Sequence, residues 1–211
     1  MPDLNKLNQA ILDGDAKTAA SVTKEALEAG VDPVVLIQQH MVPAMDEVGR
    51  LYEAEEYFVP ELLLAARAMK ASLELLRPLL AESGAEPTGR VVIGTVKGDL
   101  HDIGKNLVGS MLEGGGFEVI DLGADVAPEK FIEAIQTRGA RIVCLSALLT
   151  VTMPSMKKTI EALEQAGVRN QVKVLVGGAP VTPQFAKEIG ADGYGETANA
   201  AVALARQFVQ R

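Results

Sequence analysis

The sequence is poor in the residues that build disulfides, protein-only metal centres and aromatic cores. It has one cysteine and two histidines in 211 residues, and aromatic residues make up 4% of it. A single cysteine cannot form an internal disulfide, and histidine and cysteine together are too few for a closed zinc site of about four ligands. Hydrophobic residues still make up 48% of the chain, so we expect a core of Leu, Val, Ile and Ala.

Positive charge and long apolar runs are also scarce. The formal net charge of -8 argues against nucleic acids and anionic membranes as partners, because such surfaces are met with Lys and Arg. There is no apolar run of about 18 residues, and the first residues lack the pattern of a secretory leader. We therefore predict a soluble, cytoplasmic protein. Cys144 lies in the apolar run RIVCLSA, which indicates a buried thiol rather than a reactive one.

Up to about residue 81, the hydrophobic pattern is that of helices. Apolar residues recur at three- and four-residue spacing, and Gly30, Asp32 and Pro60 mark helix ends and starts. The pattern predicts four helices with short connections, which form a small bundle. We expect a helical domain over residues 1–88, with the polar segment 82–89 as its linker.

From Arg90 onward, short runs of branched residues alternate with helical segments. This pattern predicts an α/β fold over residues 89–211: a doubly wound, flavodoxin-like parallel sheet of five strands. Ligands of such sheets bind beyond the carboxyl ends of the strands, so the loops after Val96, Leu145 and Val176 are candidates for a site. The expected strands cover residues 90–96, 117–121, 141–147, 171–178 and 191–195.

The loop after the first predicted strand carries a histidine. It reads GTVKGDLHDIGKN over residues 94–106. One interpretation is an ordinary turn in which Asp99 or Asp102 caps the next helix. That interpretation does not explain His101, whose imidazole could hold a metal or ligand atom through one nitrogen while a nearby carboxylate binds the other N–H. A metal held here would bring most of its own ligands, as in a macrocycle.

Two other ligand classes fit this loop less well. Neither GxGxxG nor GxxxxGK[ST] is present, which weakens a dinucleotide or P-loop interpretation. A receiver-type signalling domain would need an acidic pocket at the strand ends. The loops after the third and fourth strands offer hydroxyls and glycines instead.

Three motifs together resemble those of cobalamin-binding domains. DLHDIG at residues 99–104 matches the signature DxHxxG, Ser146 begins an SxL pattern, and Gly177 and Gly178 form a GG pair. The helical half is similar to the cap bundle of cobalamin-dependent methionine synthase. The whole chain resembles the small corrinoid proteins of methyltransferase systems that use methylamines, methanol, methoxylated aromatics or betaines.

The resemblance implies a role for each matched residue. His101 would be the lower axial ligand of the corrinoid cobalt, Asp99 its hydrogen-bond partner and Thr152 the hydroxyl that completes the relay. Gly177 and Gly178 would leave room for the nucleotide tail, where a Cβ would intrude. The helical residues would cover the upper corrin face, and the alternative for them is ordinary bundle core. The expected cofactor contacts are Gly98, Asp99, Leu100, His101, Asp102, Ile103, Gly104, Ser146, Leu148, Thr150, Gly177, Gly178 and Ala198, with Phe58, Leu62 and Ala65 from the helical half.

The implied function is that of a methyl carrier with cobalamin or a related corrinoid. Its Co(I) form would accept a methyl group from a methylated C1 substrate through a partner methyltransferase. A second methyltransferase would pass the group from methyl-Co(III) to tetrahydrofolate or coenzyme M. The chain has no room for a (β/α)-barrel of roughly 250 residues, so both methyltransferases are expected to be separate proteins. A reductive activase would rescue the Co(II) form.

Two alternatives share this body plan. One is a regulatory module that senses cobalamin, which would normally need an attached DNA-binding domain. The other is the cobalamin subunit of a carbon-skeleton mutase, which would not need a helical cap. As a methyl carrier, the protein would act only in company with partner enzymes and would not be an autonomous enzyme.

Overall fold

The computed structural model describes residues 3–83 and 87–209. Internal contacts divide the chain into two units: Met1–Pro87 with Glu113–Gly116, and Thr88–Leu112 with Phe117–Arg211. The predicted linker began at residue 82, but helix α5 runs through Ser83. Residues 84–86 of that linker lie outside the described residues.

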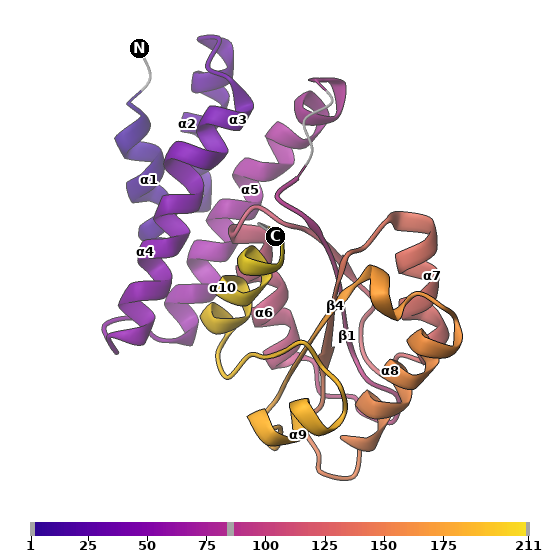
Figure 1. Cartoon of the computed structure of the whole chain (residues 1–211). Coiled ribbons are helices and arrows are strands. Elements are labelled where there is room, and N and C mark those ends of the chain that lie inside the picture. The colour runs from indigo at the N-terminus through magenta and orange to yellow at the C-terminus, as the bar shows by residue number, and fades with distance from the viewer. Residues whose placement is uncertain (1–2, 84–86, 210–211) are drawn as a thin grey trace. The chain divides into compact units, whose positions relative to one another are not determined.

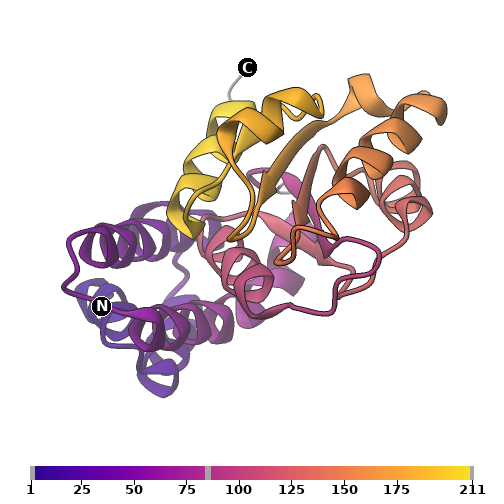
Figure 2. The same cartoon turned by 90° about the horizontal axis from the view of Figure 1, so that it is seen from below.

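Helices α1, α2, α4 and α5 lie side by side in the first unit (Figures 1 and 2). The predicted cap signals are in place, because the Asp32 carboxylate accepts the N–H of Val34 at 2.7 Å and Gly30 has a left-handed φ of +79° just after α2. The elements are α1 (Leu4–Leu12), α2 (Ala16–Glu28), α3 (Pro33–Val35), η1 (Leu36–Met41), α4 (Val42–Glu53) and α5 (Val59–Ser83).

The third predicted helix contains a π-helical segment, η1, which the sequence analysis did not anticipate. Here the N–H of Val42 donates to the carbonyl of Ile37, five residues earlier. Pro43 follows and has no N–H to continue the ordinary i→i−4 ladder. The core of the unit is formed by fully buried aliphatic side chains, among them Leu7, Ile11, Leu36, Met41, Leu62 and Met69.

The second unit contains a five-stranded sheet in the order β2-β1-β3-β4-β5. Every pair of neighbouring strands is parallel, which confirms the predicted doubly wound fold. Because β1 has β2 on one side and β3 on the other, the chain reverses its winding between β1 and β3, where ligands of such folds bind. The strands are β1 (Arg90–Thr95), β2 (Glu118–Asp121), β3 (Ile142–Ser146), β4 (Lys173–Gly177) and β5 (Gly193–Tyr194).

Helices cover both faces of this sheet (Figure 1). One face carries α6 (Ile103–Gly114) and α10 (Ala198–Val209), and the other carries α7 (Pro128–Arg138), α8 (Pro154–Gln165) and α9 (Pro183–Glu188). A short 3-10 turn, η2 (Arg169–Gln171), precedes β4. Against the second face, Phe131 and Ile160 pack on valines of the central strands. Burial of each large side chain contributes about 1.5–3 kcal/mol.

The single cysteine is buried on the central strand β3, and it does not belong to the cluster around Phe131 and Ile160. Cys144 is 5% exposed on β3, level with Ile93 of β1 and Leu175 of β4. Burial raises the pKa of its thiol to about 12. The predicted buried thiol is therefore confirmed. Across residues 3–83 and 87–209, no helix combines the length and the apolar character that crossing a membrane requires.

Candidate functional site

The histidine loop connects β1 to α6, and hydrogen bonds to its backbone carbonyls join it to both of these elements. The hydroxyl of Thr95, the last residue of β1, donates to the carbonyl of His101 at 2.9 Å. Helix α6 starts at Ile103, and the carbonyl of Asp102 accepts the N–H of Asn106 at 2.7 Å. Asp102 therefore occupies the N-cap position, whereas the Asp99 carboxylate bonds to other groups.

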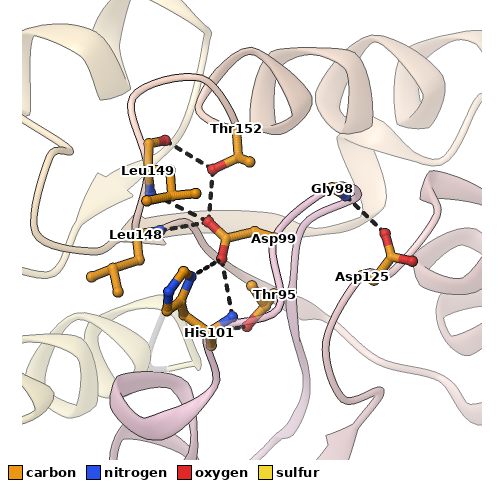
Figure 3. Close-up of polar contacts among 8 residues, drawn as sticks. All are labelled: Thr95, Gly98, Asp99, His101, Asp125, Leu148, Leu149 and Thr152. Carbon is orange, nitrogen blue, oxygen red and sulfur yellow. Dashed lines mark hydrogen bonds and ion pairs between the residues drawn. The ribbon is translucent and has the colours of Figure 1, made fainter.

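Asp99 is the centre of the site (Figure 3). Its side chain is completely buried. Oδ1 accepts the backbone N–H of His101 at 3.0 Å and lies 2.8 Å from Nδ1 of the same residue. Oδ2 accepts the N–H of Leu148 at 2.8 Å, the N–H of Leu149 at 3.3 Å and the hydroxyl of Thr152 at 2.7 Å. The structure thus brings together residues from the loops after β1 and β3.

The surroundings of Asp99 decide its ionisation. Burial acts to raise its pKa, but hydrogen bonds from Thr152, Leu148 and His101 outweigh burial and hold the pKa well below its ordinary value of 3.8. An ionised carboxylate can only accept hydrogen bonds. Nδ1 of His101 must therefore carry the hydrogen, and in the neutral ring Nε2 keeps its lone pair for a ligand or metal.

The His101 side chain is 51% exposed. Large apolar side chains are exposed close to it in the sequence and on the segment after β3: exposed fractions are 76% for Leu100, 82% for Ile103 and 79% for Val151. An accessible imidazole nitrogen, with exposed apolar side chains on the two segments that Asp99 joins, suits a metal inside a largely apolar macrocycle. In the part of the chain that the structure describes, no group of three or more His, Cys, Asp or Glu residues could itself hold a metal ion.

The glycine pair after β4 meets other segments of backbone. A Cβ on Gly178, whose φ is +129°, would lie 1.9 Å from the carbonyl oxygen of Ala147. A Cβ on Gly177 would lie 2.8 Å from the carbonyl oxygen of Gly195. The backbone segments at the ends of β3, β4 and β5 therefore approach one another too closely for a side chain at either position. This requirement for glycine holds whether or not a ligand also binds there.

The other predicted contacts of the sheet unit lie in different settings. Ser146 is half-buried and level with Gly177 in the sheet, and Ala198 is buried at the start of α10. Thr150 and Gly104 are exposed. Ser146 and Gly177 lie at the carboxyl end of the sheet, where the histidine loop begins.

The residues predicted from the helical unit do not share one surface. Phe58 is exposed, whereas Leu62 and Ala65 are completely buried. Leu62 and Ala65 lie on α5, which packs along α2, and Phe58 directly precedes this helix. Burial of Leu62 and Ala65 fits the alternative interpretation, bundle core, and in this structure neither presents a surface to a cofactor.

Sequence reasoning missed two contributors to the site. The N–H of Leu149 donates to Asp99, and the Asp125 carboxylate accepts the N–H of Gly98 at 2.8 Å. Asp125 follows β2, whose end lies beside β1 in the sheet. Its place after the second strand was a usable signal, but only once the strand order was known.

Comparison with known proteins identifies the family of the chain. A family model described as a B12 binding domain matches residues 89–203, and a second model with the same description matches residues 3–77. The chain belongs to the B12-binding family. The predicted family and its cobalamin cofactor are thereby confirmed.

Relatives of this B12-binding protein match it over nearly their whole length. It is 43% identical over 209 residues to a corrinoid protein of Desulfitobacterium hafniense, covering 98% of this chain and 97% of the relative. It is 48% identical over 200 residues to trimethylamine corrinoid protein 2 of Methanosarcina mazei, covering 94% and 92%. In the solved methanol:cobalamin methyltransferase complex MtaBC from Methanosarcina barkeri, a chain 32% identical matches with a TM-score of 0.86, covering 98% of this chain and 79% of that one.

Proposed function

We propose that this protein is a methyl carrier that works between two methyltransferases. A substrate-specific methyltransferase would deliver the methyl group of a methylated C1 compound, and a second would pass it to tetrahydrofolate or coenzyme M. The observation that carries the proposal is the exposed His101 ring, whose Nδ1 lies 2.8 Å from the buried carboxylate of Asp99. The names of the relatives, which include a trimethylamine corrinoid protein and a methyltransferase complex, support it.

His101 would bind the cobalt of the corrinoid through Nε2. When bound, the corrinoid supplies the metal that takes up and gives up the methyl group. Leu100, Ile103 and Val151 would contact the apolar macrocycle, because they are exposed on the same two loops. The nucleotide tail would lie along Ser146, Thr150, Gly177, Gly178 and Ala198, with the remaining contacts from Gly98, Asp102, Gly104, Leu148 and Phe58.

The residues of the relay control where the ring carries its hydrogens. Asp99 keeps a hydrogen on Nδ1, 2.8 Å away, so Nε2 is the atom that binds. Thr152 and the N–H of Leu148 hold the carboxylate in place.

The partners follow from the same proposal. The protein needs a methyltransferase for the donor, a second for the acceptor and a reductive activase, because a carrier that has lost its active oxidation state cannot restore it alone. We expect all of them to meet the carrier in the cytoplasm.

The first test asks whether His101 is the ligand. The protein is loaded with hydroxocobalamin, reduced to Co(II), and examined by electron paramagnetic resonance with and without nitrogen-15 histidine. The expected result is a nitrogen splitting that changes with the label, is lost in His101→Ala and is kept in the control His40→Ala. A nitrogen splitting that is the same with and without labelled histidine would contradict the assignment.

The second test asks whether the loaded protein carries methyl groups. With trimethylamine or methanol, a methyltransferase of the matching kind and an activase, the wild type is expected to pass a radiolabelled methyl group to tetrahydrofolate or coenzyme M. His101→Ala should slow transfer by more than the roughly 10–100-fold that loss of a hydrogen-bond partner of a metal ligand costs. Ligation without any transfer would reject the carrier role.

A further inference from the structure

A third loop, after β2, binds the main chain on both sides of Asp99. Oδ1 of Asp125 accepts the N–H of Gly98 at 2.8 Å, and the N–H of Asp125 donates to the carbonyl of Asp99 at 2.9 Å. Oδ2 of Asp125 lies 3.0 Å from Nζ of Lys97. Figure 3 shows Asp125 on the side of the loop opposite Leu148 and Thr152.

This contact is in register with the end of the sheet. The N–H of Thr95 donates to the carbonyl of Gly123, and the N–H of Val126 donates to the carbonyl of Thr95. Val96 and Val126 form a parallel bridge just beyond the last residues of β1. The segment that carries Asp125 therefore extends the sheet beyond β2. Its backbone hydrogen bonds fix its position relative to the start of the histidine loop.

The conformation of Asp125 is specific to this contact. Its φ is +55°, in the left-handed region, and Gly98 opposite has a φ of +89°. Residues other than glycine adopt this region rarely, Asp and Asn most readily, and they keep it where surrounding contacts stabilise it. Here the stabilising contacts are the two backbone hydrogen bonds to the histidine loop.

The histidine ring depends on Asp99 for its orientation. The ring is half-exposed, so packing alone does not hold it, and the hydrogen bond from Nδ1 to Asp99 does. Residues after β3 hold the carboxylate of Asp99, while Asp125 holds its main chain. If the main chain of this loop moved, the carboxylate could not keep its bonds to His101 and its bonds to Leu148 and Thr152 at once, and the ring would lose its present orientation in either case.

We propose that Asp125 is a positioning residue for His101. It acts through the main chain of Gly98 and Asp99 and does not touch the ring. The inference rests on the proposed role of His101 as the cobalt ligand, but its structural half can be tested without a corrinoid.

Three variants separate the possible effects of Asp125. Asp125→Gly removes the carboxylate and tolerates the left-handed conformation. Asp125→Asn tolerates it too and keeps an oxygen that can accept the N–H of Gly98. Lys97→Ala removes the ion pair alone.

The first measurement is amide hydrogen exchange by NMR on the full chain without corrinoid. We expect exchange at the N–H groups of Gly98 and His101 to be about five-fold faster in Asp125→Gly, as for the loss of one hydrogen bond. Asp125→Asn and Lys97→Ala should match the wild type. The N–H of Val174, which bonds to Asp192 at the other end of the sheet, should be unchanged in all variants and serves as the internal reference.

The second measurement is the fraction of loaded Co(II) protein that shows the nitrogen-15 histidine splitting. The equilibrium constant for ligation should fall about five-fold in Asp125→Gly and recover in Asp125→Asn. A variant Asp125→Gly that melts at a lower temperature but keeps wild-type ligation and exchange would overturn the proposal. If even the wild type lacks the splitting, the cobalt role of His101 fails, and the exchange comparison alone decides whether Asp125 positions the ring.

Discussion

Two aspartates bind loops at opposite ends of the same sheet, and their partners differ in kind. Asp192, at the amino end, accepts the N–H of Val174 at 2.8 Å. Its Oδ2 lies 2.8 Å from Nη2 of Arg169, and its Oδ1 lies 3.2 Å from Nζ of Lys173. Asp99, at the carboxyl end, accepts bonds from backbone N–H groups, a hydroxyl and an imidazole.

The difference distinguishes a carboxylate that only stabilises the fold from one that also orients a side chain able to bind a ligand. The side chains beside Asp192 are a guanidinium and an ammonium group, which only donate hydrogen bonds and offer no atom that could bind a metal. The imidazole beside Asp99 has a second nitrogen, which is left to bind a ligand when the first donates to the carboxylate. In doubly wound sheets ligands bind at the carboxyl ends, which is where Asp99 and His101 lie.

The largest expected effect comes from comparing one glycine at each end of the sheet. Gly178→Ala would place a Cβ 1.9 Å from the carbonyl oxygen of Ala147, whereas around a Cβ on Gly190 nothing lies within 4 Å. Both have positive φ. We expect Gly178→Ala to lower the free energy of unfolding by about 4 kcal/mol, because backbone must move. Gly190→Ala should cost about 1 kcal/mol, the strain of the left-handed conformation.

Urea unfolding followed by circular dichroism measures both values. Equal losses in the two variants would mean that the loops at the carboxyl end yield as easily as open surface, and the tight contact of Gly178 with Ala147 would lose its significance.

The next effect compares the aspartates themselves. Asp99→Asn replaces a buried acceptor with an amide whose NH₂ must face other donors, and we expect a loss of about 3 kcal/mol at pH 7. Asp192→Asn removes ion pairs whose side chains keep some contact with water, and it should cost about 1 kcal/mol.

The pH dependence of this difference gives an independent check. The pKa of Asp99 is lower in the folded protein than its ordinary value of 3.8. The unfolded chain therefore takes up the proton first, and the stability that Asp99 contributes is complete above pH 3.8 and is lost as the pH falls further. The difference between wild type and Asp99→Asn should shrink below pH 3.8. A constant difference down to the acid transition would show that the ionised state contributes nothing.

The smallest effect concerns the hydroxyl of Thr152, which donates to Asp99 at 2.7 Å. Thr152→Val keeps the shape and removes the hydrogen bond, so we expect a loss of about 1 kcal/mol and a weaker histidine splitting in the loaded protein. Thr152→Ser keeps the hydroxyl and should retain the splitting. If serine weakens the splitting and valine does not, packing of the methyl group, rather than the hydrogen bond, holds the carboxylate.

Local chemistry explains which features could be predicted from the sequence. Runs of branched residues located the strands, and the two-residue spacing of Asp99 and His101 suggested their contact, because both effects act between near neighbours. The roles of Asp125 and Gly178 depend on which loops meet in space. Their partners, Gly98 and Ala147, lie 27 and 31 positions away, and only the strand order brings them together.

The helical half shows a different limit. Periodicity identifies the apolar side of a helix but not whether that side faces its own bundle or a ligand, so Leu62 and Ala65 fitted both interpretations until their burial was known. The π-helical segment before Pro43 depends on how freed carbonyls find new donors, which periodicity does not specify.

The thiol of Cys144 can report how often the buried core around β3 becomes accessible to solvent. Its strand, β3, lies between β1 and β4, and its thiol is buried with a pKa of about 12. Side chains of a strand stand roughly perpendicular to the sheet, so an alkylating reagent can reach the sulfur only after the layer that covers this face of the sheet has opened. Because the chain has a single cysteine, the rate of its modification would count those openings directly, with no foreign label.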